Sequence, residues 1–186
     1  TQCLRDMRYA DAVKYLGQVS SSFQYAMNTF KDGFMKRDPF SLRASSLLDN
    51  TSDYKYNFAR EMHSLEQSIK QTTEPNRKAQ LQIKYAMGLE NSINRCWALT
   101  QYYKGEYLYG FSYDMDWTKR EAWKRANTRC KRLLKEAFAM FTDKEAAANA
   151  HWLLGNNVTI MNNYPDTEIA AYVRQHCDCL KDYVGQ

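Results

Sequence analysis

Turn-forming residues are scarce in this chain, and this scarcity constrains its fold more than any other feature. Only 7 Gly and 3 Pro occur among 186 residues. Sheet proteins need frequent turns, whereas a few long helices do not, so the composition favours helices. The mean hydropathy is -0.71 although 44% of the residues are hydrophobic, which is typical of amphipathic segments. No run of about 18 apolar residues is present, and we therefore predict an all-α chain without a transmembrane segment.

Apolar residues recur every three or four positions over several long stretches. A helix brings residues with this spacing onto one face, which can then be buried against a neighbour. The clearest stripe is formed by Tyr54, Phe58, Met62, Leu65 and Ile69. The spacing predicts helices over residues 8–16, 53–72, 75–103 and 117–141. Because the connections are short, we expect antiparallel neighbours within a single domain that spans residues 1–186.

The helix expected over residues 75–103 has two apolar faces. One face is formed by Ala79, Ile83, Ala86, Met87, Ile93 and Trp97. The other is formed by Leu81, Tyr85, Leu89, Cys96 and Tyr103. A helix that is apolar on two sides is covered on two sides, so we expect this helix at the centre of the fold.

Residues 142–184 are predicted to form a helical hairpin. Thr142 and Glu145 have the spacing of a capping box, which starts a helix that we expect to run to about Asn163. The polar stretch 162–167 then forms a turn, and Asp166 or Thr167 caps the last helix. Hairpins of this kind are stacking units, and stacked units usually make binding surfaces rather than catalytic clefts.

The hairpin resembles a known repeat. Leu153-Leu154-Gly155, followed by Tyr164-Pro165-Asp166-Thr167 and the apolar run that begins at Ile169, is similar to the tetratricopeptide-type repeat of bacterial envelope lipoproteins. The resemblance implies antiparallel helical hairpins stacked in a TPR-like, repeat-like arrangement.

The chain carries a second resemblance. The whole chain, including residues 37–41 and 91–99, is similar to the C-terminal part of large uncharacterised proteins of gut anaerobes. Together the resemblances imply a binding role and a location in the bacterial cell envelope, in the periplasm or at the outer membrane, with a cytoplasmic location left open. The chain also opens abruptly in helix-forming sequence, from which we expect it to be the C-terminal fragment of a longer protein.

Positive charge is concentrated in one predicted helix. The net charge is +5, and residues 117–135 alone hold eight basic residues and one acid. A helical wheel places six of them opposite the apolar stripe: Arg120, Lys124, Arg125, Lys131, Arg132 and Lys135. This basic face is a candidate surface for an acidic partner, anionic lipid or phosphate, and its alternative is a solvated helix face. Nucleic acid is disfavoured because the rest of the chain is net negative.

Aromatic residues gather in the loop expected between residues 104 and 116. Exposed Tyr107, Tyr109 and Tyr113 would stack on glycans or peptides. The alternative is that the loop folds back and its rings cap the helical bundle, since apolar groups prefer burial.

A polar band interrupts one apolar face of the central helix. It comprises Glu90, Asn91, Asn94 and Arg95. Buried polar groups of this kind usually form a satisfied hydrogen-bonded network. The alternative is a deep pocket of an unrecognised enzyme around Glu90 and Arg95.

Catalytic and metal-binding motifs were sought and not found in the sequence. His63, His151 and His176 lack a Gly-flanked Ser or Cys partner, so no nucleophilic triad can be assembled. Cys177 and Cys179 lie two residues apart on a helix and point in different directions, so they cannot close on one ion. We expect no metal and no other cofactor. The sequence predicts a non-catalytic scaffold that binds a protein or peptide, with a glycan-binding envelope component as the alternative.

Overall fold

The computed structural model describes residues 2–20, 22, 38–40, 54–94 and 117–176, and within them every regular element is a helix. The helices are α1 (Gln2–Arg5), α2 (Tyr9–Leu16), α4 (Tyr54–Gln71), α5 (Pro75–Asn94), α6 (Trp117–Met140), α7 (Lys144–Leu153), α8 (Asn157–Asn163) and α9 (Glu168–His176). The predicted all-α class is confirmed. The four helices predicted from periodicity, a short one and three long ones, begin within one residue of their expected starts. The expected extension of α5 through residues 95–103 lies outside the described residues.

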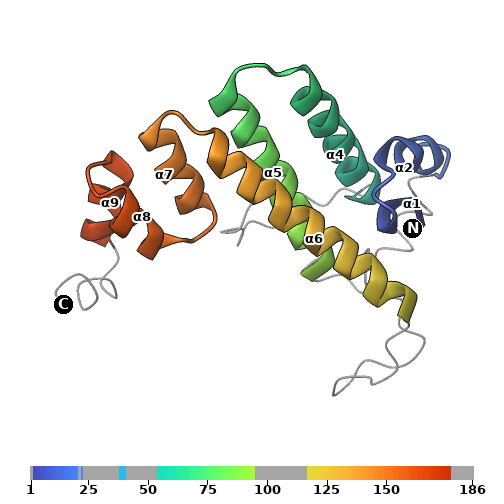
Figure 1. Ribbon diagram of the computed structural model, residues 1–186. Helices are drawn as coiled ribbons and strands as arrows, with labels where there is room; N and C mark the ends of the chain where they lie inside the picture. Colours follow the sequence, from blue (N-terminus) through green and yellow to red (C-terminus); the bar gives the residue numbers. More distant parts are fainter. Residues whose placement is uncertain (1, 21, 23–37, 41–53, 95–116, 177–186) are drawn as a thin grey trace.

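Helices that follow each other in the chain also lie beside each other in space (Figure 1). The antiparallel helices α4, α5 and α6 form the middle of the molecule, α1 and α2 cover one end of α4, and α7, α8 and α9 gather at the opposite end. The described part of the chain is therefore an elongated row of helices with α5 near its centre.

Helix α5 is covered on two sides, as its two apolar faces predicted. Tyr85 and Leu89 are buried in a core shared with α1, α2, α4 and α6. Ile83 and Met87 are buried in a second core shared with α6 and α7. Each of these side chains is at most 4% exposed, and burying one of them contributes roughly 1.5–3 kcal/mol.

Phe40 approaches α5 so closely at Gly88 that a larger residue there would require a neighbouring side chain to shift. A Cβ built on Gly88 would lie 2.6 Å from Phe40 Cε1 and 2.7 Å from the sulfur of Met62. Asn91 donates a hydrogen bond of 2.7 Å to the carbonyl of Pro39, which fixes the backbone beside Phe40. The short segment 38–40 is therefore held against α5 by one hydrogen bond and one close approach.

Replacing Gly88 by alanine should destabilise the protein. The steric cost of overpacking, about 1–3 kcal/mol, exceeds the gain of about 1 kcal/mol from better helix propensity. Chemical denaturation measures the difference. In a Phe40→Ala background the steric cost should fall, so equal losses in both backgrounds would contradict the close approach.

The predicted capping box at Thr142 is wrong, although a helix does start there. Asp143 is the N-cap of α7, and its Oδ1 accepts a hydrogen bond of 2.9 Å from the backbone N–H of Glu145. Glu145 does not reach back as the box requires. Its carboxylate accepts hydrogen bonds of 2.9 and 3.0 Å from the backbone N–H groups of Glu168 and Ile169, because the first turn of α9 lies beside it with unpaired donors.

The single helix expected from Thr142 to about Asn163 is also wrong, because it is split. Helix α7 ends at Leu153 and α8 starts at Asn157. Gly155, between them, has a φ of +73°, a conformation that ends helices and that glycine adopts without strain. Thr167 caps α9 as predicted, since its Oγ1 accepts a hydrogen bond from Ala170 N. Three short helices thus share one small core: Ala148, Ile160, Met161, Ala170 and Val173.

His151 joins α7 to α6 through a ring stack. Its imidazole lies 4.0 Å, centroid to centroid, from the ring of Phe138, and 5.6 Å from that of Tyr164. The side-chain amide of Asn156 lies 3.4 Å from Nδ1 of the imidazole. Burial lowers the pKa of His151, because the charged form loses hydration there.

The lowered pKa of His151 predicts acid sensitivity. The folded state binds this proton less tightly than the unfolded chain, whose histidine pKa is about 6.5, so the contribution of His151 is complete above that pH. It should be lost as the pH falls through 6.5 towards the folded-state pKa. Denaturant midpoints measured between pH 7.5 and 5 should fall more steeply for the wild type than for His151→Phe, which keeps the ring stack. Parallel pH profiles would refute this origin.

Candidate functional site

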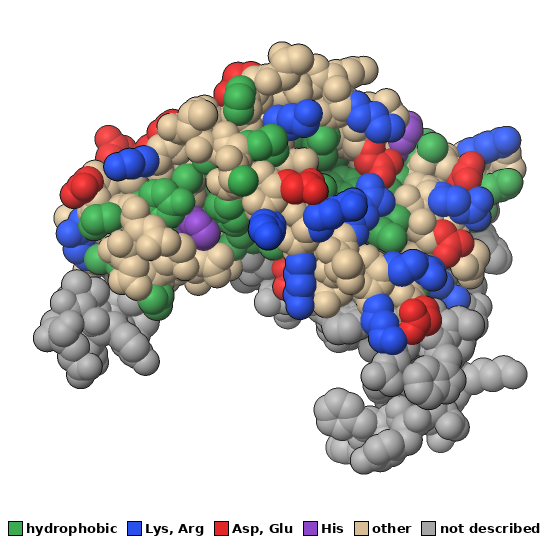
Figure 2. All heavy atoms as spheres, viewed as in Figure 1, with side chains coloured by type: hydrophobic (Ala, Val, Ile, Leu, Met, Phe, Trp, Pro, Cys, Tyr) green, Lys and Arg blue, Asp and Glu red, His purple; other side chains and the backbone are tan. Residues whose placement is uncertain are grey.

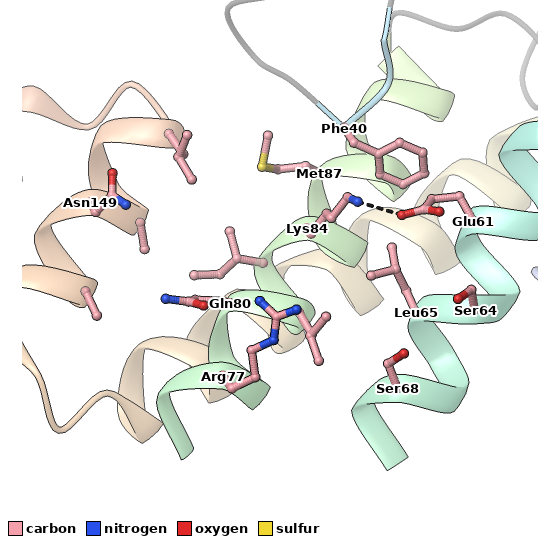
Figure 3. Close-up of a pocket in the computed structure, with 15 residues that line it drawn as sticks. Phe40, Glu61, Ser64, Leu65, Ser68, Arg77, Gln80, Lys84, Met87 and Asn149 are labelled. Atoms are coloured by element: carbon pink, nitrogen blue, oxygen red, sulfur yellow. Dashed lines mark hydrogen bonds and ion pairs between the residues drawn. The ribbon is translucent and has the colours of Figure 1, made fainter. Parts of the chain in front are cut away.

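A groove of about 640 Å³ lies over α5, between α4 and α7 (Figure 3). Each of the three helices lines it with residues spaced i, i+3, i+4 and i+7, which is one helical stripe. The stripes are Glu61, Ser64, Leu65 and Ser68 from α4; Arg77, Gln80, Leu81 and Lys84 from α5; and Ala146, Asn149, Ala150 and Leu153 from α7. Phe40, Ile83 and Met87 complete the lining. Three helices therefore direct one face each at the same space.

The floor of the groove is apolar and its rim is polar. Leu65, Ile83, Met87 and Ala150 lie at the bottom and are nearly fully buried. The rim carries exposed hydroxyl and amide groups, and one large apolar side chain, Leu153, is 46% exposed there. An apolar floor with a few polar groups at its edge is the usual composition of a binding site.

Two cationic side chains of α5 line the groove, and only one of them is paired with a carboxylate. Lys84 Nζ lies 2.6 Å from a carboxylate oxygen of Glu61 on α4 and 5.4 Å from the centroid of the Phe40 ring. Arg77 is exposed and makes no ion pair with any residue in the described part of the chain. The nearby carboxylate of Glu74 accepts hydrogen bonds from the backbone N–H groups of Asn76 and Arg77 at the start of α5.

Asn76 sets the position of α7 relative to α5. Its Oδ1 accepts a hydrogen bond of 2.9 Å from Thr142 N, and its Nδ2 donates one of 3.0 Å to Thr142 Oγ1. These contacts tie the first turn of α5 to the corner between α6 and α7, so they help to fix the width of the groove.

Lys124, Arg125 and Arg132 of the predicted basic face lie against carboxylates, whereas Lys131 and Lys135 make no ion pair with a described residue. Lys124 lies 2.7 Å from Glu121 within α6, and Arg132 lies 3.6 Å from Glu136. Arg125 reaches Asp6 at the end of α1, at 3.3 Å. Figure 2 shows Lys and Arg side chains along α6 with Asp and Glu side chains among them. The Arg120 side chain lies outside the described residues.

A partly buried cluster of polar side chains lies on the inner side of α6, and the sequence did not indicate it. Glu66 accepts hydrogen bonds of 2.8 Å from the hydroxyl of Tyr85 and 3.1 Å from Arg129 Nη2. The Arg129 guanidinium also lies 5.0 Å from the centroid of the Tyr85 ring. Burial, and to a smaller extent Glu66, raises the pKa of Tyr85. The Glu66 cluster, defined by these three residues, joins α4, α5 and α6.

The remaining predicted sites are only partly described. Tyr107, Tyr109, Tyr113 and Arg95, together with the Asn94 side chain, lie outside the described residues. Glu90 is half-buried.

Glu90 affects a neighbouring thiol. Burial, with a smaller contribution from Glu90, raises the pKa of Cys130 to about 11, and the thiol donates a 3.4 Å hydrogen bond to the carbonyl of Ala86. Such a thiol stays protonated near neutral pH and is a poor nucleophile.

Within the described residues no cluster of His, Cys, Asp or Glu has the composition of a metal site. None of the described helices combines the length and apolar character needed to cross a bilayer. Comparison with protein-family models, with curated proteins and with solved structures gives no match.

Two arginines on α6 should differ in their effect on stability. Arg129→Ala leaves the mostly buried Glu66 carboxylate without its cation and should cost about 2 kcal/mol. Arg132→Ala removes an exposed i,i+4 pair and should change stability by less than about 0.5 kcal/mol. Urea denaturation of both variants tests this, and equal losses would show that the Glu66 cluster contributes no more than a surface pair.

Proposed function

We propose that this chain is a non-catalytic helical scaffold that binds a protein or peptide in the groove between α4, α5 and α7. The observation that carries the proposal is the convergence of three helical stripes on one open, apolar-floored groove. A groove with an apolar lining and a few polar groups at its edge is the usual form of a binding site. A bound segment would bury the exposed part of Leu153, which is 46% exposed at the rim.

The chemistry of the lining supports binding rather than catalysis. Its ionisable side chains are Glu61, Lys84 and Arg77, and the first two neutralise each other. General acid–base or nucleophilic catalysis uses a group with a free proton or electron pair aimed at the substrate. The described lining contains neither His nor Cys, and its one carboxylate is paired.

A TPR-like stacking and a bacterial envelope location are also part of the proposal. Sequential antiparallel helices with a groove on one side support the stacking. The division of the C-terminal segment into α7, α8 and α9 departs from a simple two-helix unit, so any likeness to that repeat is looser than the sequence implied.

Truncation of one apolar rim residue should weaken binding. Peptides selected on the wild-type protein from a displayed random library should lose affinity about five- to tenfold on Leu153→Ser, because a contact worth about 1 kcal/mol or more is removed. Val158→Ser is the matched control, since Val158 is similarly exposed, at 53%, but lies on α8 outside the groove. Fluorescence anisotropy measures both. If selection gives no peptide sensitive to Leu153→Ser, the groove is not the binding site.

A further inference from the structure

We infer that the partner of this groove is an amphipathic α-helix that places a carboxylate against Arg77. The inference rests on the proposed function and specifies the conformation and charge of the bound segment.

The apolar floor favours a helix over an extended strand. A strand lying on Leu65, Leu81 and Met87 would turn backbone N–H and C=O groups towards apolar side chains, and each unpaired group is costly. The walls offer no strand edge to pair with, because α4, α5 and α7 use their own backbone groups within their helices. A helix satisfies its backbone internally and presents only side chains to the floor.

The dimensions of the groove match about three helical turns. From Arg77 to Met87, both in the lining, α5 advances ten residues, or about 15 Å at the usual helical rise. A partner helix of about ten residues covers this length with apolar side chains at three- and four-residue spacing. Leu81, which is half-buried, and Leu153, which is exposed, are then the apolar surface available to those side chains.

The charges in the groove favour a partner that carries a negative charge. Lys84 is neutralised by Glu61, and the other polar side chains at the rim, on Ser64, Ser68, Gln80 and Asn149, are uncharged. Arg77 is left as an exposed cation without an ion-pair partner among the described residues. A carboxylate on the partner would complete this pair, whereas a cation there would be repelled.

Selection from a displayed library of random peptides of about 16 residues tests the inference. The wild-type protein is the bait, and Leu153→Ser is the counter-selection bait. We expect the retained peptides to have apolar residues at three- and four-residue spacing with an acidic residue on the edge of that stripe. Their circular dichroism should become helical on binding.

Charge reversal at Arg77 provides the second arm. Arg77→Glu should lower the affinity for the acidic peptides about three- to tenfold, and a Glu→Lys exchange in the peptide should restore binding. An acidic residue in the first turn of α5 is compatible with the helix dipole, so the variant should remain folded. Lys144→Glu is the matched control, because Lys144 is likewise exposed in the first turn of a helix, α7, and does not line the groove.

The outcomes separate this inference from the proposed function. Groove-dependent peptides that are basic, that bind in extended form or that ignore Arg77→Glu would overturn the inference and leave the scaffold proposal standing. Equal losses with Arg77→Glu and Lys144→Glu would reduce the effect to net charge and also overturn it. Failure to select any peptide sensitive to Leu153→Ser would overturn both.

Discussion

Helix α5 buries apolar side chains on two faces, and this requirement determines where its neighbours lie. Tyr85 and Leu89 pack against α4 and α6 on one face of α5, while Ile83 and Met87 pack against α6 and α7 on the other. One side of α5 remains between α4 and α7, and that side lines the groove. The groove thus forms because α4 and α7 both pack against α5 and leave a space between them.

Polar contacts then fix the geometry that the apolar cores permit. Asn76 joins the start of α5 to the corner before α7, and the Glu66 cluster joins α4, α5 and α6. Hydrogen bonds to partly buried charged groups are directional and costly to leave unpaired. They therefore restrict how far the two walls of the groove can move apart.

Ion pairs reduce the free positive charge of the basic segment on α6. In the sequence, Lys124, Arg125 and Arg132 form a continuous cationic face that suggests an acidic ligand. In the structure each lies within 4 Å of a carboxylate, and one of these carboxylates comes from α1. Exposed pairs of this kind stabilise little, but they reduce the free charge available to a partner. Lys131 and Lys135 in that segment, and Arg77 outside it, have no ion-pair partner among the described residues.

The sequence alone determined the helical class, the main helix positions and the central place of α5, because these follow from periodic burial within single segments. The Tyr54–Ile69 stripe and the two faces of α5 needed no knowledge of neighbouring helices. The tertiary structure decided what single segments cannot encode. Glu145 caps α9 instead of α7, because the nearest unpaired N–H groups belong to a helix that is distant in sequence. The groove also depends on the tertiary structure. In the sequence, the residues around Glu61, Arg77 and Leu153 are three ordinary helical stripes. Only the packing of α4, α5 and α7 brings these stripes to one space.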